Sequence, residues 1–457
     1  MPRPWHGGRA VRVFMGPMEV AGYYAALRRG LAELGVPCVL LDEARSAHGY
    51  HTDDPSLAVR LLRAAAARTE RAAARGPRVV AAASKLESVT RLLVFLYLAA
   101  RCDAFIYSYG GTITFYPALE LRLLRHLGRR IVFVYHGNDS RLPYLGHPRL
   151  TTARGGTLAE CLTYTTTLRD KLRLVERYAD VIVTNPYSAH LHARRAVNWQ
   201  VIGIPFPAPS DEESAPPARG DGRVRVLHSP SDPEMKGTDR VRLAVESLVA
   251  RGRPIDYVEI TGRPHAEVIA EIRRCDIVVD QLYSDTPMAG FATEAAAYGR
   301  PAVIGSYIGP HLAPFVPPAS MPPVALCNPE DLEHALDALV TDRDLREDLG
   351  RRAREWVIRE RAPRVVASRY LRLLRGDIPP EWTFDPQDVQ YVHGLASEEF
   401  VRRWVRALVA HGGADALQLD ENPGARDRLL AFAGLDVGDG DRSRARRDLP
   451  DSAEVAP

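Results

Sequence analysis

The feature that most constrains this fold is a regular alternation of short apolar runs and helical patterns, interrupted once and then resumed. In the first half, the apolar runs are Val11–Met15, Val36–Leu41, Ala104–Tyr107, Ile131–Tyr135 and Val181–Thr184, with helical periodicity between them. Strands separated by helices pair in parallel, and the helices cover both faces of the sheet. We therefore expect residues 1–206 to form a doubly wound, Rossmann-like α/β domain.

The interruption is residues 207–222, which are rich in Pro, Ser, Gly and charged side chains. Such a composition buries too little apolar surface to fold alone, so we expect a linker. Alternation of strands and helices resumes over 223–376 and predicts a second Rossmann-like domain, including one helical stretch over 343–375. A helical extension over 377–437 and a charged, disordered tail over 438–457 complete the predicted organisation.

Composition limits the classes of protein that fit. The 457 residues are 46% hydrophobic and 26% charged, as in soluble globular proteins, which excludes a mostly disordered chain and a multi-span membrane protein. The net charge of +3 gives no argument for a nucleic-acid partner. The five cysteines form no CxxC pair, which favours reduced thiols and a cytoplasmic protein.

Two apolar segments need a place in this organisation. Leu92–Ala100 is the most apolar run, too short to cross a bilayer, and we expect a buried helix there. Residues 397–411 carry Val401, Trp404, Val405 and Leu408 on one helical face. That face needs a partner, either a domain surface or a second copy of the chain in a homodimer.

The segment 226–239 is the first candidate site, since ligands of doubly wound domains bind at the carboxyl ends of strands. A strand ends at His228, and a loop leads to Lys236-Gly237-Thr238-Asp239, where Thr238 can N-cap the next helix. A lysine beside a helix N-terminus makes an anion site. The alternative is a solvated lysine in an ordinary loop.

The second candidate is the loop and helix start after the strand near 276–280. Backbone N–H groups of Ala289, Gly290, Phe291 and Ala292 can hold a phosphate or a sugar hydroxyl there. Glu294, in the first helical turn, can accept two ribose hydroxyls. It can equally serve only to favour the helix dipole.

These motifs together resemble the retaining GT-B glycosyltransferases of family 4. The resemblance rests on Lys236-Gly237-Thr238-Asp239, Cys275-Asp276-Ile277, Gly290-Phe291-Ala292-Thr293-Glu294-Ala295 and Gly299-Arg300-Pro301-Ala302-Val303, and it covers about residues 10–376. It implies two Rossmann-like domains facing a central cleft, with a nucleotide diphosphate sugar held mainly by the second. It also implies transfer without a metal or other cofactor, and it leaves the nucleotide open between GDP and UDP.

The resemblance assigns roles in donor binding. It implies that Lys236 contacts the diphosphate, Glu294 the ribose, and the amides of Gly290–Ala292 the sugar or phosphate. Gly262, in the turn after a strand, is implied to lie near the base. In the first domain, the loop Gly16–Gly22 matches the family's glycine-rich loop under the diphosphate, and Gly22 permits close backbone approach.

His136 ends an apolar strand and is similar to the family's His-Gly segment facing the sugar. Its imidazole can hydrogen-bond a donor hydroxyl or help move the acceptor proton, which makes it a catalytic candidate with Lys236 and Glu294. The alternative is a histidine that satisfies a backbone group at the strand end. Asn138, Asp139 and Arg141 are candidates for the acceptor side, although Asp139 can equally cap a turn.

The chain departs from the family pattern at two positions. Thr286 stands where the family has the first of two glutamates, and Asp285 beside it is a candidate substitute. Ser231 stands where the family has an arginine five residues before the lysine, and it is kept among the candidate donor-binding residues. No D-x-D triplet looks like a metal site: one is Asp342-Arg343-Asp344 at a helix start, and the other is Asp439-Gly440-Asp441 in the tail.

The sequence therefore favours a metal-independent, retaining glycosyltransferase acting on a small secondary metabolite or a surface glycan, as in antibiotic or polysaccharide biosynthesis. One alternative keeps the fold and changes the chemistry, as a nucleotide-sugar epimerase or a pseudo-glycosyltransferase. Another is a non-catalytic scaffold partner that uses the helix at 397–411 as its interface.

Overall fold

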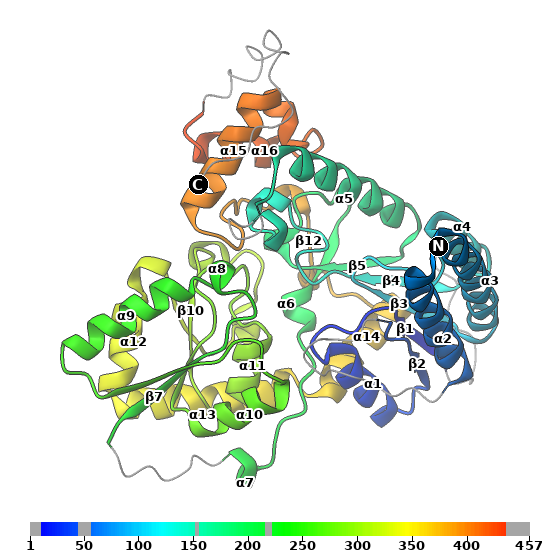
Figure 1. Ribbon diagram of the computed structural model, residues 1–457. Helices are drawn as coiled ribbons and strands as arrows, with labels where there is room; N and C mark the ends of the chain where they lie inside the picture. Colours follow the sequence, from blue (N-terminus) through cyan, green and yellow to red (C-terminus); the bar gives the residue numbers. More distant parts are fainter. Residues whose placement is uncertain (1–10, 44–55, 151–154, 215–221, 436–457) are drawn as a thin grey trace.

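The computed structural model describes residues 11–43, 56–150, 155–214 and 222–435 (Figure 1). Its first sheet has the strand order β12-β6-β5-β4-β3-β1-β2, and its neighbours are parallel except β12 and β6. The strands are β1 (Val13–Gly16), β2 (Cys38–Leu40), β3 (Ala104–Ser108), β4 (Arg130–Val134), β5 (Val181–Thr184), β6 (Ala196–Asn198) and β12 (Thr383–Phe384). The helices between them are α1 (Tyr23–Glu33), α2 (Leu57–Ala72), α3 (Pro77–Arg101), α4 (Pro117–His126), α5 (Leu158–Tyr178) and α6 (Trp199–Ile202).

Alternate residues of these strands face two different helix layers, because successive side chains of a strand point to opposite sides. Val132 and Val134 of β4 pack with α1 and with α14 (Pro363–Arg375). Ile131 and Phe133 pack in a separate core with α2, α3, α4 and α5. Helix α14 approaches α1 so closely that a Cβ atom on Gly30 would lie 2.0 Å from the Pro363 carbonyl oxygen.

The second sheet is parallel throughout, with the strand order β11-β10-β9-β7-β8. Its strands are β7 (Val224–His228), β8 (Ile255–Glu259), β9 (Ile277–Val279), β10 (Ala302–Gly305) and β11 (Ala325–Cys327). Its helices are α8 (Pro233–Lys236), α9 (Thr238–Ala250), α10 (His265–Arg274), α11 (Gly290–Ala297), α12 (Leu332–Thr341) and α13 (Arg343–Glu360). Helices α9 and α12 cover one face of this sheet, and α10, α11 and α13 cover the other.

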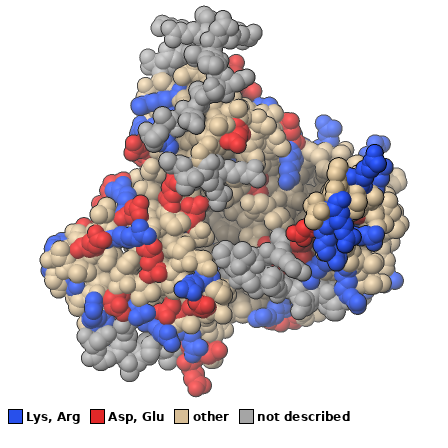
Figure 2. All heavy atoms as spheres, in the orientation of Figure 1, with Lys and Arg blue, Asp and Glu red and all other residues tan. Residues whose placement is uncertain are grey.

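Two doubly wound α/β units with a helical C-terminal extension confirm the predicted fold class. Figure 2 shows the surface hollowed between the two units. The predicted single helical stretch over 343–375 is wrong, because the chain breaks before Pro363, which begins α14. Since α14 then packs under the first sheet, the chain crosses back before residue 376.

The predicted domain boundaries remain proposals. Within the predicted linker 207–222, Asp211–Ser214 forms the short helix α7, and residues 215–221 lie outside the described residues. The predicted tail 438–457, with Asp439-Gly440-Asp441, also lies outside them.

The C-terminal extension consists mainly of α15 (Glu398–Gly412) and α16 (Pro423–Phe432), which lie beside α5 (Figure 1). The apolar face of α15 is buried in the core that also holds α5 and β4, with Val401, Val405 and Leu408 at 0% exposure. Of the two predicted partners for this face, the domain surface is therefore the correct one. The homodimer through this helix is not supported, because its apolar face is already covered within the chain.

Helix α3 differs from its prediction as a buried helix. Val94, Phe95 and Leu98 are buried, but Leu93 and Tyr97 of the same apolar run are 62% and 49% exposed. Among the described residues, no helix is long and apolar enough to cross a membrane. All five cysteines are free thiols, as predicted.

Candidate functional site

The second sheet has its topological switch point between β7 and β9. The chain goes from β7 to β8 on one side, and then to β9 on the other side of β7. Ligands of doubly wound sheets bind in the crevice at the carboxyl ends of such strands. The segments that follow β7 and β9 contain Lys236 and Gly290, so both candidate motifs of this domain lie at the switch point.

Lys236 ends the short helix α8 and links these two segments. Its Nζ donates a hydrogen bond to Oε1 of Gln281, and its carbonyl accepts one from the amide of Leu282 at 3.0 Å. Gly237 follows with φ of 69°, and a Cβ atom there would lie 2.7 Å from the Leu282 Cβ. The glycine therefore allows the two loops to touch, which holds the ammonium group over the β9 loop.

The predicted N-cap of the next helix is wrong. Gly237 occupies the N-cap position of α9, and Thr238 is the first helical residue. The Thr238 hydroxyl is fully buried and lies 3.0 Å from Nε2 of His228. Because His228 needs a partner inside the core, Thr238 satisfies the histidine rather than the helix end.

The N-terminus of α11 is open. Its N-cap, Ala289, provides no side-chain hydrogen bond, and no acidic residue stands in its first turn. Gly290, Phe291 and Ala292 are the first three helical residues, whose N–H groups have no carbonyl within the helix to bond. The positive end of the helix dipole and these amides thus face the same edge of the sheet as Lys236.

Glu294 lies in the second turn of α11, not in the first, because the helix begins at Gly290. Its side chain is 10% exposed, and its Oε1 lies 2.8 Å from Nε2 of His265 on α10. A carboxylate held in this way keeps one oxygen bound to the imidazole. The pair joins the starts of the helices that follow β8 and β9.

The other predicted donor contacts are peripheral or occupied. Ser231 and Gly262 are exposed in the loops after β7 and β8. The amide of Thr286 donates to the Ser284 hydroxyl at 3.2 Å. Asp285 forms a buried ion pair with Arg141 of the first unit, and its carbonyl accepts from Asn185 at 2.8 Å. Its carboxylate thus joins the two units.

Arg141 itself is 2% exposed and also donates to the Asn138 side chain. Gly137, with φ of 119°, leaves room for the guanidinium, since a Cβ atom there would lie 2.8 Å from Nη2. Asp139 caps the turn by accepting from the His136 amide at 2.8 Å. Burial raises the pKa of Asp139 to about 6.

His136 lies at the end of β4 among aromatic rings. Its ring centroid is 5.1 Å from that of Tyr23, 5.7 Å from Tyr24 and 6.2 Å from Trp199. The Tyr24 hydroxyl lies 2.9 Å from Nε2. Burial lowers the pKa of His136 to about 3, so the imidazole is neutral at neutral pH. It can take part in hydrogen bonds, but it is a poor acceptor for a full proton.

The loop Gly16–Gly22 after β1 contains a residue that the sequence reasoning missed. The Glu19 carboxylate accepts hydrogen bonds from the amides of Val20 and Tyr24 through Oε1, at 2.8 and 3.0 Å, and from Ala25 through Oε2 at 2.8 Å. It therefore fills the N-terminus of α1. Burial raises the pKa of Glu19. A glutamate shortly before the helix start was the available signal.

The switch point of the first sheet is closed by further contacts. Ser108, at the end of β3, donates to the Met18 carbonyl at 2.7 Å, and its hydroxyl accepts from the Met18 amide at 2.9 Å. A Cβ atom on Gly111 would lie 2.8 Å from the Pro17 ring. The loop Gly16–Gly22 thus packs against the end of β3 and the residues that follow it.

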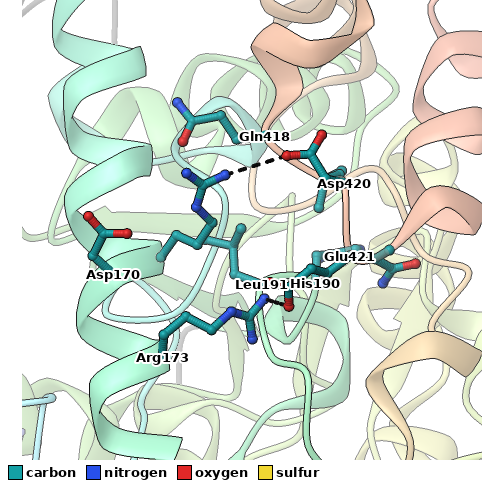
Figure 3. Close-up of a pocket in the computed structure, with 10 residues that line it drawn as sticks. Asp170, Arg173, His190, Leu191, Gln418, Asp420 and Glu421 are labelled. Carbon is teal, nitrogen blue, oxygen red and sulfur yellow. Dashed lines mark ion pairs between the residues drawn. The ribbon is translucent and has the colours of Figure 1, made fainter.

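A separate cavity of about 300 Å³ lies between α5 and the C-terminal extension (Figure 3). Its arginines are paired, Arg169 with Asp420 at 3.8 Å and Arg173 with Glu421. None of the predicted site residues lines it. In the described part of the chain, no group of three or more His, Cys, Asp or Glu side chains is arranged to hold a metal ion.

No protein-family model matches the sequence, and no curated protein matches it. Three solved structures share features of the fold. A mutant of S. aureus TarM in complex with Fondaparinux, alpha-GlcNAc-glycerol and UDP is 14% identical over 62% of this chain and 59% of that chain, with a TM-score of 0.37. The glycotransferase of kitacinnamycin (12% identity, TM-score 0.42) and Anabaena Alr3699/HepE in complex with UDP and glucose (11% identity, TM-score 0.44) each match 80% of this chain and 99% of their own chain. The chain is thus similar, at low identity, to glycosyltransferase structures, and these scores indicate no particular reaction.

Proposed function

We propose that the chain is a glycosyltransferase that moves a sugar from a nucleotide diphosphate sugar to an acceptor, without a metal and with retention of configuration. One observation carries this proposal: an ammonium group, Lys236, and the open N-terminus of α11 share the switch point of the second sheet. Both supply positive charge where a diphosphate would sit.

The charge of this crevice fits the departure of a diphosphate. As the bond between the sugar and the diphosphate breaks, negative charge grows on the leaving oxygen. Preorganised amides and an ammonium stabilise such charge without reorganisation, and one such donor is worth about a hundredfold or more in rate. Glu294, oriented by His265, is assigned to the ribose hydroxyls.

The acceptor proton is assigned to the leaving diphosphate. The neutral imidazole of His136 is a weak base, because the pKa of this side chain is lowered to about 3. In the retaining reaction we propose, the acceptor oxygen attacks from the face that the diphosphate leaves. The O–H proton of the acceptor then passes to a diphosphate oxygen, and His136 hydrogen-bonds a hydroxyl of the sugar.

One observation favours a second candidate on the same fold. Asp285, the possible substitute for the family's first glutamate, is bound to Arg141, and Thr286 supplies no carboxylate. Altered handling of the donor sugar would suit a nucleotide-sugar epimerase or a pseudo-glycosyltransferase. Analysis of the products formed from a sugar donor, with and without an acceptor, separates these reactions.

Calorimetric titration with UDP, GDP and ADP, without added metal, tests the donor site. We expect one nucleotide to bind the wild-type protein, with affinity reduced about tenfold or more in Lys236→Ala and in Glu294→Ala, a loss of about 1.4 kcal/mol each. Lys85→Ala and Glu267→Ala, on exposed helix surfaces, are the matched controls. If the folded protein binds none of the three nucleotides, the transferase proposal fails.

A further inference from the structure

Helix α3 carries an apolar surface that faces away from the core. Its apolar residues follow one another at helical spacing: Val79, Leu86, Val89, Leu93 and Leu96. The steps are three or four residues, except the first, which is seven and has Ala82 within it. Residues at this spacing share one helical face. Tyr97 adjoins them. These six side chains, here called the α3 surface, are between 42% and 62% exposed. Single exposed leucines are ordinary, but a contiguous apolar surface marks an interaction site.

The α3 surface is bordered by positive charge. In residues 57–101, all of which the structure describes, Glu70 is the one exposed acidic side chain. The exposed basic side chains of the same stretch are Arg60, Arg68, Arg71, Arg75, Arg78, Lys85 and Arg101. Figure 2 shows Lys and Arg gathered over this part of the molecule. The whole chain is nearly balanced, with 60 basic and 57 acidic residues, so the charge is local.

The acidic side chain nearest to this surface in sequence offers no compensation. Glu87 is buried, and its Oε1 accepts from Nε of Arg91 at 2.9 Å. Arg101 lies over the Tyr97 ring, 4.7 Å from its centroid. The border of the α3 surface is therefore cationic near both ends of the helix.

A second copy of the chain is a poor occupant of this surface. The seven-residue repeat would suit a helix pair, but Arg78 and Lys85 flank the apolar positions near one end, and Arg101 stands at the other. Parallel pairing brings Arg78 against Arg78, and antiparallel pairing brings it toward Arg101. Like charges across such a contact are destabilising in either orientation.

We propose that the α3 surface docks the protein on an anionic lipid bilayer. The apolar side chains enter the boundary between headgroups and acyl chains, and the arginines contact lipid phosphates. Tyr97 suits the interface, because its ring is apolar and its hydroxyl is polar. The helix lies on the membrane and does not cross it. This inference is independent of the reaction at the second sheet.

Sedimentation of the full chain with lipid vesicles tests the proposal. We expect binding to phosphatidylcholine vesicles that contain phosphatidylglycerol, and little to phosphatidylcholine alone. Binding weakens from about 0.1 M to about 1 M salt, as the Debye length falls from about 10 Å to about 3 Å. The triple variant Arg71→Gln, Arg75→Gln, Arg78→Gln lowers partitioning about tenfold or more. The double variant Val89→Ser, Leu93→Ser lowers it as well.

The control replaces three exposed arginines of α13, as Arg343→Gln, Arg351→Gln, Arg359→Gln, and leaves partitioning unchanged. All replaced side chains are exposed, and circular dichroism verifies the fold of each variant. The proposal is overturned if the wild-type protein does not bind anionic vesicles, binds neutral vesicles equally well, or is weakened as much by the α13 changes. A dimer in solution that Val89→Ser, Leu93→Ser disperses would show instead that a second copy occupies this surface.

Discussion

The two α/β units have the same strand order at their switch points, but a helix start beside one switch point is filled by a carboxylate and a helix start beside the other is not. In the first unit, the helix after β1 begins with its amides bound to the Glu19 carboxylate. In the second unit, α11 begins without a capping side chain or an acidic residue in its first turn. Parallel sheet order thus places several helix starts where an anion could bind, and the Glu19 carboxylate in the first loop fills one of them.

The difference teaches where an external anion is needed. A buried amide without a partner is costly, so a helix start is completed either by the chain or by a ligand or solvent. In the first unit, the start of α1 is completed by the chain's own Glu19. In the second unit the start of α11 has no capping side chain and lies at the same edge of the sheet as Lys236, and this is the arrangement on which the proposed donor site rests.

The largest effect is expected from Glu19→Ala. Three amides lose a charged acceptor, and hydrogen bonds to charged groups contribute about 1.5–3 kcal/mol each. Because burial of the carboxylate offsets part of this sum, we expect a loss of about 4 kcal/mol in the free energy of unfolding. Urea denaturation measures it. Glu33→Ala, at the exposed end of the same helix, is the control and should change stability little.

The same variant sharpens the comparison in a second way. With Glu19 removed, the start of α1 should gain affinity for inorganic phosphate, measurable by the rise of the denaturation midpoint with phosphate. If Glu19→Ala unfolds like Glu33→Ala, the carboxylate does not complete the helix, and the contrast between the units is lost.

A smaller effect is expected from the protonation of His136. Its pKa is lowered to about 3, so below pH 6.5 the imidazole binds a proton in the unfolded chain but stays neutral in the folded chain. Stability contributed by the neutral ring is therefore full above pH 6.5 and falls with pH, by about 3 kcal/mol between pH 6.5 and pH 4. His136→Gln should remove this slope, and His334→Gln, on the exposed face of α12, should keep it.

The protonation of Asp139 changes stability with pH in the opposite sense, and Asp139 is present in both the wild-type protein and the His136→Gln variant. Its pKa is raised to about 6, so the folded carboxyl takes up its proton before the unfolded one, which adds stability as pH falls from 6 toward 4. The difference between the wild-type and His136→Gln curves isolates the histidine. Parallel curves between pH 4 and pH 6.5 would mean that the aromatic pocket does not keep the ring neutral.

The smallest effect on stability, but a decisive one for the comparison, is expected from Ala289→Asp. It gives α11 an N-cap carboxylate, so that a side chain binds the first amides of this helix, as Glu19 does in α1. We expect a gain of about 1 kcal/mol in the free energy of unfolding and a loss of about tenfold or more in nucleotide affinity. Both follow from filling the same amides.

Ala362→Asp is the matched change, since Ala362 is the N-cap of α14 and also lacks a side-chain hydrogen bond. It should stabilise similarly and leave nucleotide binding unchanged. Denaturation and calorimetry on the two variants together separate capping from blocking. Unchanged nucleotide binding in Ala289→Asp would show that the donor does not bind at the start of α11.

Much of the fold follows from periodicity in the sequence. The apolar runs before Gly16, at 131–135 and at 181–184 became buried strands, since a fully buried parallel strand needs a continuous apolar run. The helix predicted at Leu92–Ala100 is present, but it is buried on one face only. The hydrophobicity of a segment does not indicate which side of a helix packs against a core, and α3 has more apolar residues than the core buries.

The candidate site was only partly accessible in this way. Lys236 and Gly290 were found because strand ends and glycine-rich helix starts are local patterns. Gln281 lies 45 positions from Lys236, and His265, at the start of α10, lies 29 positions from Glu294, so no local pattern indicates either contact. The pairing of Asp285 with Arg141 spans 144 positions of the chain, so local spacing left Asp285 as a candidate ligand.

The sequence by itself determined the two alternating α/β halves, the break between them and the edges of the sheets where a ligand would bind, because these depend on short-range periodicity and chain order. The tertiary structure decided which helix start is filled, which carboxylate joins the two units, and which apolar face stays exposed. Those outcomes depend on contacts between residues far apart in the chain, where burial, charge and space are shared among several elements at once.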